Sequence, residues 1–398
     1  MICSEYEILI LPAKYSFMNF KFSYLLMPAA LMFVVYSCGN SMKSDKNQSG
    51  KTAKEKVQLP YDTSLTAIAE IIAGNRPADT SGANAVVQTQ AWKNHATVID
   101  SLFSAAERRN LKFMRQWAAS ELPEGKDTSA TLFYAFSGPD YLYANTFYPA
   151  AKRYVLFGLE PVGKIPVFDA SKNHQLFFDN IRRSLKSSLA LNFFITKDMS
   201  GDLRSSEYNG VTSIIMLYAA YTGHKIKDIQ YVIADTTGKL IQCPYDSLRL
   251  RKETKGVQFH LIDSLGHNKE VVYFSFNAMD GEIEKTSIFP FFKSLSGNIF
   301  GMLKAASYLM HYDSFSKIRN LYLSKVTTLL SDDTGLAWKT FIKTFPKHHL
   351  YGKYSDPVSM FTYISLKDLK AAYDSIPVKP MSFHYGYGTG QKVMIGRK

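Results

Sequence analysis

Two short apolar runs separated by a turn and a helical pattern constrain the fold of this chain more than any other feature. The runs cover residues 131–136 and 154–159, and neither alternates with polar residues. Such runs are typical of strands that are buried on both faces, as in parallel sheets. Because parallel neighbours need a crossover, which is right-handed in nearly all known cases, the pattern predicts a strand–helix–strand unit.

The segment between the two runs has the residues of a helix start. Ser137 offers a capping hydroxyl, and Gly138 lacks a Cβ atom. Pro139 has the φ angle of a first helical position, and Asp140 would place an acid in the first turn. Pro149 limits the predicted helix to about two and a half turns.

Polar residues follow both predicted strands, where open α/β sheets bind their ligands. Ser137 and Gly138 are the candidate ligand-binding residues, because a helix N-terminus offers N–H groups to an anion. Asp140 and Glu160 are candidate catalytic carboxylates at the same edge. The alternative is that the turn is only a well-capped helix start and Glu160 only a surface acid at a strand end.

The rest of the body predicts further helices and strands. The helices are expected at 64–72, 92–122, 174–191, 298–310, 315–330 and 336–345, and the strands at 192–196, 229–234, 257–262, 270–276 and 382–390. The fold class is therefore α/β, with a central, mostly parallel sheet containing a Rossmann-like strand–helix–strand unit. A helical N-terminal lead-in and a partly antiparallel extension of the sheet complete it.

Three more polar residues are candidates for catalysis. His311 would share a helical face with Lys304 and Ser307, a combination suited to nucleophilic chemistry, although a solvated face is the alternative. Asp333 begins an Asp-Thr-Gly tripeptide, for which capping of the following helix is the simpler explanation. His384 lies in the closing glycine-rich strand.

Residues 1–37 have the pattern of a signal segment, with Met18 as the expected true start. Residues 35–38, Val-Tyr-Ser-Cys, resemble a bacterial lipobox, which implies lipidation of Cys38; an ordinary secretory signal is the alternative. Residues 38–58 are a predicted flexible tether, rich in Ser, Asn, Gly and Lys, and residues 59–398 are a predicted single α/β domain. The expected location is the outer membrane, facing the periplasm.

The folded part is basic and has no disulfide. Residues 1–37 are neutral, and the tether has five lysines against Asp45 and Glu55, so +10 of the chain's +13 charge falls on residues 59–398. This balance favours anionic envelope partners, and nucleic acid is not expected. With Cys38 lipidated, Cys243 has no partner in the mature chain, so the fold depends on its core.

No HExxH, GxSxG or CxxC motif occurs, so neither a metal nor a cofactor is predicted. Residues 136–144, 158–163 and 304–311 resemble an uncharacterised family of lipoproteins from Bacteroidota, for which no activity is implied. We expect an envelope lipoprotein that binds a small polar or anionic ligand or an envelope component. The alternative is a periplasmic hydrolase or transferase that uses carboxylates and histidine, and the sequence leaves open whether the protein is an enzyme.

Overall fold

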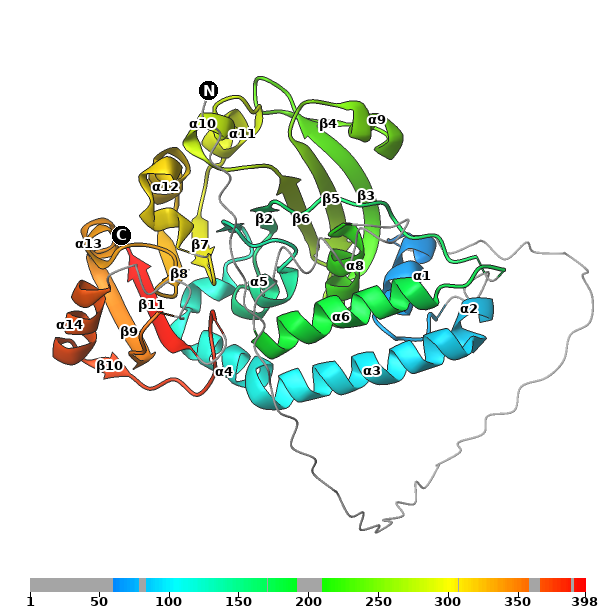
Figure 1. The fold of residues 1–398 in the computed structure, drawn as a ribbon, viewed down its shortest axis with the longest axis horizontal. Coiled ribbons are helices and arrows are strands. Elements are labelled where there is room, and N and C mark those ends of the chain that lie inside the picture. Colours follow the sequence, from blue (N-terminus) through cyan, green and yellow to red (C-terminus); the bar gives the residue numbers. More distant parts are fainter. Residues whose placement is uncertain are drawn as a thin grey trace, which may run out of the picture. The chain divides into compact units, whose positions relative to one another are not determined.

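An 11-stranded sheet with helices on both faces forms the centre of the unit Val57–Lys398 (Figure 1). The structure, a computed structural model, describes residues 60–78, 84–169, 171–191, 210–306, 308–357, 366–387 and 390–398. The signal segment, Cys38, the tether up to residue 58 and the strand predicted at 192–196 lie outside these residues. The α/β class and the mostly parallel, mixed sheet expected from the sequence are confirmed.

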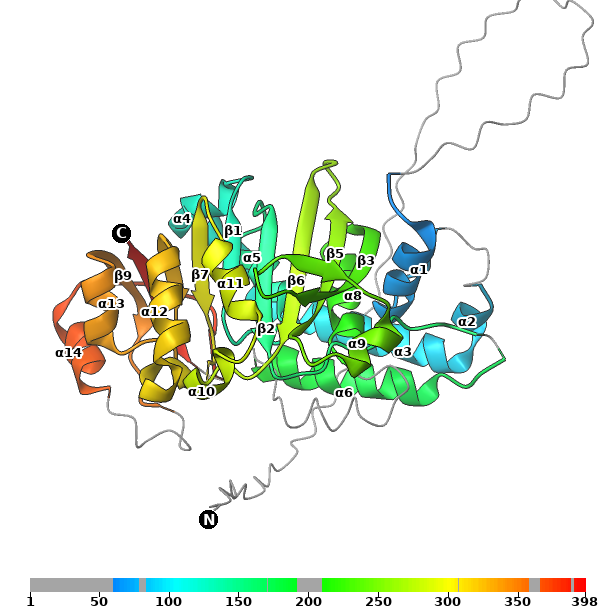
Figure 2. The same cartoon turned by 90° about the horizontal axis from the view of Figure 1, so that it is seen from above.

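The strands lie in the order β10-β9-β11-β8-β7-β1-β2-β6-β5-β3-β4. Figure 2 shows them side by side from β9 to β3. The bounds are β1 Thr131–Tyr134, β2 Arg153–Gly158, β3 Lys225–Ala234, β4 Leu240–Gln242, β5 Lys255–Ile262, β6 Asn268–Ser275, β7 Ile299–Leu303, β8 Thr328–Ser331, β9 Lys347–Lys353, β10 Val378–Lys379 and β11 Gln391–Arg397.

Two groups of helices cover the sheet. One group comprises α1 Thr63–Ile72, α2 Asn84–Gln88, α3 Gln90–Ala106, α4 Lys112–Glu121, α5 Tyr141–Phe147, α6 Gln175–Leu191 and α8 Thr212–Tyr221. The other comprises α10 Asp280–Ile283, α11 Ile288–Ser294, α12 Ser316–Lys325, α13 Trp338–Thr344 and α14 Lys367–Ser375, and α9 Tyr245–Leu250 follows β4. In Figure 1 the first group lies to the lower right of the sheet and the second to the upper left.

The five central strands, β8-β7-β1-β2-β6, are parallel, and they are buried on both faces. Leu132 and Tyr134 of β1 pack in the core with α1, α3 and α6, whereas Phe133 packs with α11 and α12. The predicted strands at 131–136 and 154–159 are adjacent and parallel, with Leu132 opposite Tyr154. Burial on both sides explains why these strands show no polar alternation.

Antiparallel strands extend the sheet on both sides of this parallel centre. On one side β5 pairs with β6 and β3, as the consecutive strand pattern between 229 and 276 predicts. On the other side β11 lies between β8 and β9 and is antiparallel to both. The last strand of the chain is therefore an interior strand of the sheet.

The prediction of a helix over 298–310 is wrong, because this segment contains strand β7. Ile299, Met302 and Leu303 match a helical spacing, but the strand is buried on both faces and needs apolar residues at every position. Gly301 explains how it fits: a Cβ atom there would lie 2.6 Å from the hydroxyl oxygen of Tyr322. The close packing of α12 on β7 therefore requires glycine at position 301.

Two other predicted boundaries are also wrong. The helix expected over 315–330 ends at Lys325, and Thr328–Ser331 forms strand β8. The closing strand expected over 382–390 begins later, at Gln391, so His384 precedes it. The helix predicted over 92–122 occurs as α3 and α4, joined by a π-helical turn over Glu107–Leu111.

Candidate functional site

Charged residues follow three neighbouring parallel strands at the point where each strand ends. The order β8-β7-β1 places the segments after residues 331, 303 and 134 at one edge of the sheet. These segments carry Asp332 and Asp333, Lys304, and Asp140. All four residues are buried. We call these residues, together with Lys392, the charge cluster.

The backbone at this edge is conformationally unusual. Phe136, Ala305 and Tyr308 have φ angles of 56°, 51° and 61°, and they are all the non-glycine residues with positive φ in the part of the chain that the structure describes. Left-handed backbone costs such residues of order 1 kcal/mol or more each, and it persists where the surrounding structure imposes it. Strain concentrated at one strand edge is typical of functional sites.

Asp140 and Lys304 form a buried ion pair. Lys304 Nζ lies 2.8 Å from Asp140 Oδ2, and the hydroxyl of Tyr134 donates to the same oxygen at 2.8 Å. The ammonium also lies 3.8 Å from the ring centre of Tyr143. Burial lowers the pKa of Lys304, whereas the Asp140 carboxylate raises it. The pair links the turn after β1 to the end of β7.

Asp332 accepts hydrogen bonds from its own segment and from the segment that follows β7. Its Oδ1 accepts from the amide and hydroxyl of Thr334, and its Oδ2 accepts from the amide of Ala305 at 2.9 Å. Gly386, with φ of 75°, approaches so closely that a Cβ atom there would lie 2.1 Å from Asp332 Oδ2. Burial raises the pKa of Asp332 to about 6, and the adjacent Asp333 acts in the same direction. An acid that titrates this near neutral pH is suited to proton transfer.

Asp333 connects the cluster to the last strand. Its Oδ2 lies 2.9 Å from Lys392 Nζ and accepts a hydrogen bond from the Tyr308 hydroxyl at 2.8 Å. The Nε2 of His311 lies 3.2 Å from the backbone oxygen of Asp333, and burial lowers the pKa of this histidine. His311 therefore contacts Asp333 through the main chain and not through the carboxylate.

The turn after β1 uses its polar groups internally. Ser137 Oγ accepts from the amide of Phe157 at 3.2 Å and donates to the oxygen of Gly138. The amide of Gly138 donates to the oxygen of Phe157. Asp140, and not Ser137, is the N-cap of α5, with its Oδ1 accepting from the amide of Tyr143. The predicted ligand-binding pair thus joins β1 to β2.

Glu160 lies next to this turn. A Cβ atom at position 158 would lie 2.3 Å from Glu160 Oε2, and one at position 138 would lie 3.4 Å from it, so glycines leave room for the carboxylate. The hydroxyl of Tyr273 donates to both the backbone oxygen and Oε2 of Glu160. Glu160 is therefore a buried residue and not a surface acid.

His384 takes a different position from the other candidates. Its amide donates to the side-chain oxygen of Asn110 in the π-helical turn after α3, and its ring Nδ1 is buried without a hydrogen bond in the described structure. Among the described residues, neither Asp140 nor Glu160 forms a hydrogen bond or ion pair with His311 or His384. The structure thus brings Asp140, Asp333 and His311 to one edge, but without a carboxylate–histidine pair.

The sequence reasoning missed Asp332 and Lys392 and placed Lys304 on a helix. The β-branched run Val326-Thr327-Thr328 is the sequence signal for the strand that has Asp332 at its end. Asp333 likewise follows strand β8. The prediction that it caps the next helix is wrong, because the N-cap of α13 is Ala337. Ser307 lies outside the described residues. Lys392 reaches the cluster only because β11 inserts beside β8.

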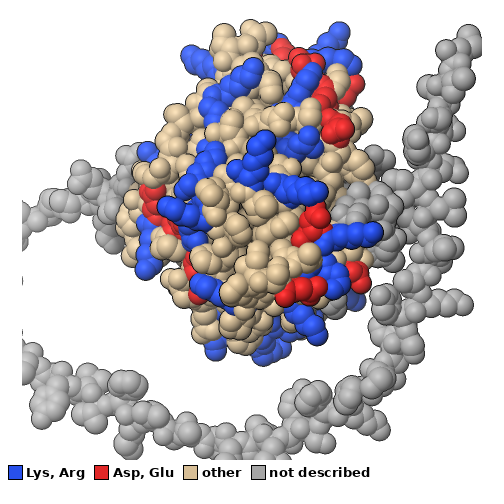
Figure 3. All heavy atoms as spheres, turned by 90° about the vertical axis from the view of Figure 1, so that its left-hand side faces the viewer, with Lys and Arg blue, Asp and Glu red and all other residues tan. Residues whose placement is uncertain are grey.

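A basic face is the second prominent feature of the surface. Residues 338–357 and 366–379 carry seven lysines and three aspartates, and all seven lysines are exposed. Figure 3 shows this side of the molecule, where lysine and arginine side chains are spread across the surface and groups of aspartate and glutamate side chains lie between them. Lys343, Lys347, Lys353 and Lys367 have no ion pair within the described structure, whereas Lys339, Lys370 and Lys379 are paired. We call these seven lysines the basic face.

In the described ranges, no group of three or more His, Cys, Asp or Glu residues could hold a metal ion. Within the same ranges, no helix is both long enough and apolar enough to span a bilayer. Comparison with known proteins gives no match: no family model, no curated protein and no solved structure is significantly similar to this chain.

Proposed function

We propose that this protein is an envelope lipoprotein whose basic face binds anionic lipid headgroups at the membrane that anchors it. The observation that carries this proposal is the set of seven exposed lysines against three aspartates in residues 338–357 and 366–379, which include the end strands β9 and β10 of the sheet. The lipobox-like segment supports an anchor at Cys38 in the outer membrane, with the folded unit in the periplasm. The likeness to lipoproteins of Bacteroidota is part of the same proposal.

The energetics of this proposal rest on two weak signals acting together. A lysine near an anionic membrane contributes about 1 kcal/mol, so the four lysines without ion pairs would contribute about 4 kcal/mol. A single acyl chain holds a protein only reversibly, and stable attachment takes a second signal, such as another acyl chain or a basic patch. We propose that residues 39–58 act as a tether, and twenty residues span at most about 70 Å when fully extended.

Vesicle sedimentation tests this binding without the anchor. The mature chain with Cys38→Ser is expected to sediment with vesicles containing phosphatidylglycerol and not with phosphatidylcholine alone, and less at high salt, because salt screens exposed charges. A variant with four Lys→Gln changes on the basic face is expected to lose most of this binding. The four positions are Lys343, Lys347, Lys353 and Lys367.

The matched control removes the same charge from four exposed lysines elsewhere. The control positions are Lys93, Lys112, Lys164 and Lys172, each changed to Gln. Equal loss of vesicle binding in both variants would show that only net charge matters, and this outcome contradicts a role for the basic face. Binding of the Cys38→Ser chain to neutral and anionic vesicles alike would contradict it as well.

The lipid anchor has its own test. Metabolic labelling with a fatty acid should give label in the wild-type chain and none in the Cys38→Ala variant. Label of equal intensity in the variant contradicts lipidation at this position and leaves the proposal for the basic face unaffected.

A second candidate function is a hydrolase or transferase at the charge cluster. It is favoured by Asp332, because the pKa of this residue is raised and its carboxylate accepts a hydrogen bond from the amide of Ala305, one of the residues with positive φ. The parallel pairing of β1 and β2 around α5 supports the finer proposal of a Rossmann-like unit with a helical N-terminal lead-in, whose strand ends would form the site. The described residues show no hydrogen bond or ion pair between a carboxylate of the charge cluster and His311 or His384, and this makes the enzyme the second candidate.

A panel of chromogenic phosphate, ester and glycoside substrates tests the enzyme. If one is turned over, Asp332→Asn is expected to lower the rate by about 10²-fold or more, because it removes a titrating acid. Asp356→Asn, at an exposed aspartate that follows β9, is the control. Turnover that survives Asp332→Asn contradicts the assignment of this residue.

A further inference from the structure

A hollow of about 820 Å³ lies at the opposite edge of the sheet from the charge cluster. Its walls come from the segments that precede β1, β2 and β6, and from the turn between α8 and β3. The lining includes Lys126, Lys152, His224, Asp263 and Lys269. This volume is within the range of small-molecule sites, and most of the lining residues are polar or charged.

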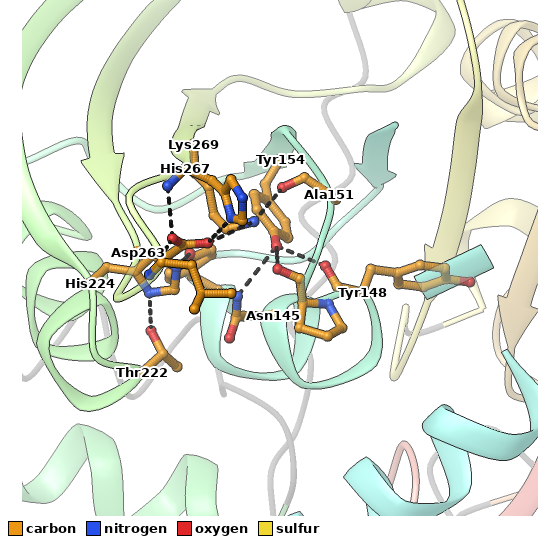
Figure 4. A network of polar contacts seen from close by, with 12 residues as sticks. Asn145, Tyr148, Ala151, Tyr154, Thr222, His224, Asp263, His267 and Lys269 are labelled. Atoms are coloured by element: carbon orange, nitrogen blue, oxygen red, sulfur yellow. Dashed lines mark hydrogen bonds and ion pairs between the residues drawn. The ribbon is translucent and has the colours of Figure 1, made fainter. Parts of the chain in front are cut away.

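Lys269 is the buried cation of this hollow. Its side chain is 4% exposed, and Nζ donates to the backbone oxygen of Ala151 at 3.2 Å (Figure 4). Asp263 Oδ2 is 3.9 Å away, beyond hydrogen-bond distance. An ammonium has three N–H donors, and one of them has a hydrogen-bond acceptor among the described residues. Burial accordingly lowers the pKa of Lys269.

The oxygens of Asp263 are already engaged in holding the turn between β5 and β6. Oδ1 accepts from the amides of Leu265 and His267, both at 2.9 Å, and Oδ2 lies 3.1 Å from the His267 ring. Burial alone would raise the pKa of Asp263, but the hydrogen bonds from His267 and Leu265 lower it. Asp263 is therefore a fixed part of the wall and only a distant partner for the ammonium.

Another part of the lining is polar and uncharged. The Nδ1 of His224 lies 2.9 Å from the hydroxyl of Thr222, and Asn145 donates to the hydroxyl of Tyr154 at 3.3 Å (Figure 4). Burial lowers the pKa of His224 to about 4, so this ring is neutral at physiological pH. The Nε2 of His224 lies 3.5 Å from the hydroxyl of Tyr141, so both ring nitrogens face polar groups of the protein and the ring adds no charge to the hollow.

The charges of the lining favour an anion. Lys126, Lys152 and Lys269 face the hollow, and Asp263 is the acid that lines it. We propose that this hollow binds a small organic or inorganic oxyanion, with a carboxylate or phosphate oxygen of the ligand accepting a hydrogen bond from the Lys269 ammonium. Lys126 and Lys152, both exposed, attract the ligand to the opening. This site is separate from the basic face and does not depend on the proposed membrane function.

Isothermal titration calorimetry with inorganic phosphate and with succinate tests the site and distinguishes the two sources of the oxyanion. The protein is the mature chain with Cys38→Ser. At least one of the two anions is expected to bind, and Lys269→Met is expected to weaken this binding at least tenfold. Lys343→Met removes the same charge from the basic face and is expected to leave the affinity unchanged.

A second variant blocks the hollow without touching the lysine. Ala150→Phe places an aromatic ring in the lining and is expected to weaken binding of the same anion, and it decides the test if Lys269→Met does not fold. Binding of neither anion by the parent chain overturns the proposal. Equal binding by the parent and by the folded Lys269→Met variant also overturns it, as does an equal loss in Lys343→Met.

Discussion

At the scale of single residues, the ion pair between Asp140 and Lys304 ties two strand ends together. Both side chains are almost fully buried, so removal of one partner leaves an uncompensated charge. We predict that Lys304→Met lowers the free energy of unfolding by about 3–5 kcal/mol. Urea denaturation measures this change. Lys370→Met, which breaks the exposed pair with Asp374, should cost less than about 1 kcal/mol, and equal losses would contradict the prediction.

The raised pKa of Asp332 predicts how the stability of the protein depends on pH. Its pKa is about 6 in the folded chain against an ordinary value of 3.8, so folding favours the protonated form. Its contribution to stability is therefore fully present below about pH 4 and is lost as the pH rises through about 6, a change of about 3 kcal/mol. The difference in unfolding free energy between wild type and Asp332→Asn should shift by this amount between pH 4 and 7. A difference in unfolding free energy that stays constant between pH 4 and 7 would contradict the raised pKa of Asp332.

The positions of Asp140, Lys304 and Asp332 differ in how far the sequence alone could predict them. Asp140 could be singled out because it follows an apolar run and precedes a proline-limited helix, and both signals are local. Lys304 and Asp332 could not be placed, since their roles depend on which strands are neighbours. Strand order is a property of the whole sheet, and the local spacing around Lys304 favours a helix.

At the scale of elements, His95 joins the helices α3 and α6. Its Nε2 donates to the backbone oxygen of Ile72 at 2.8 Å, and its ring stacks on Phe178 with 4.5 Å between ring centres. Burial lowers the pKa of His95 to about 4. The unfolded chain therefore binds a proton that the folded chain does not between about pH 6.5 and 4.

The consequence is a loss of stability in acid. The stability that neutral His95 contributes is present above about pH 6.5 and is lost as the pH falls to about 4, a change of about 3 kcal/mol. We predict that the His95→Leu variant lacks this part of the acid destabilisation, although it is less stable at pH 7 because the oxygen of Ile72 loses its hydrogen bond. Thermal unfolding at several pH values compares the two chains. Parallel pH curves for both chains would rule out this role.

At the scale of the whole molecule, strand β11 joins two parts of the sheet, because it lies between β8 and β9. β11 pairs with both β8 and β9, and Val393, Met394 and Ile395 are fully or almost fully buried. Each such side chain contributes about 1.5–3 kcal/mol through burial, and the net stability of a domain is about 5–15 kcal/mol. We predict that deletion of residues 391–398 abolishes cooperative unfolding, as circular dichroism during heating will show. Deletion of the exposed Lys398 alone should preserve the transition, and a cooperative transition in the longer deletion would contradict the prediction.

The sequence by itself determined the α/β class, the adjacent parallel strands at 131–136 and 154–159, and the antiparallel strands between 229 and 276, because each has a local pattern of burial or turn residues. Only the tertiary structure decided that 298–310 contains a strand, and that β11 inserts between β8 and β9. A run that is apolar at every position satisfies a buried strand and a buried helix equally. The choice depends on its neighbours: Gly301 lies against Tyr322, and Lys392 reaches Asp333, only once the sheet has assembled.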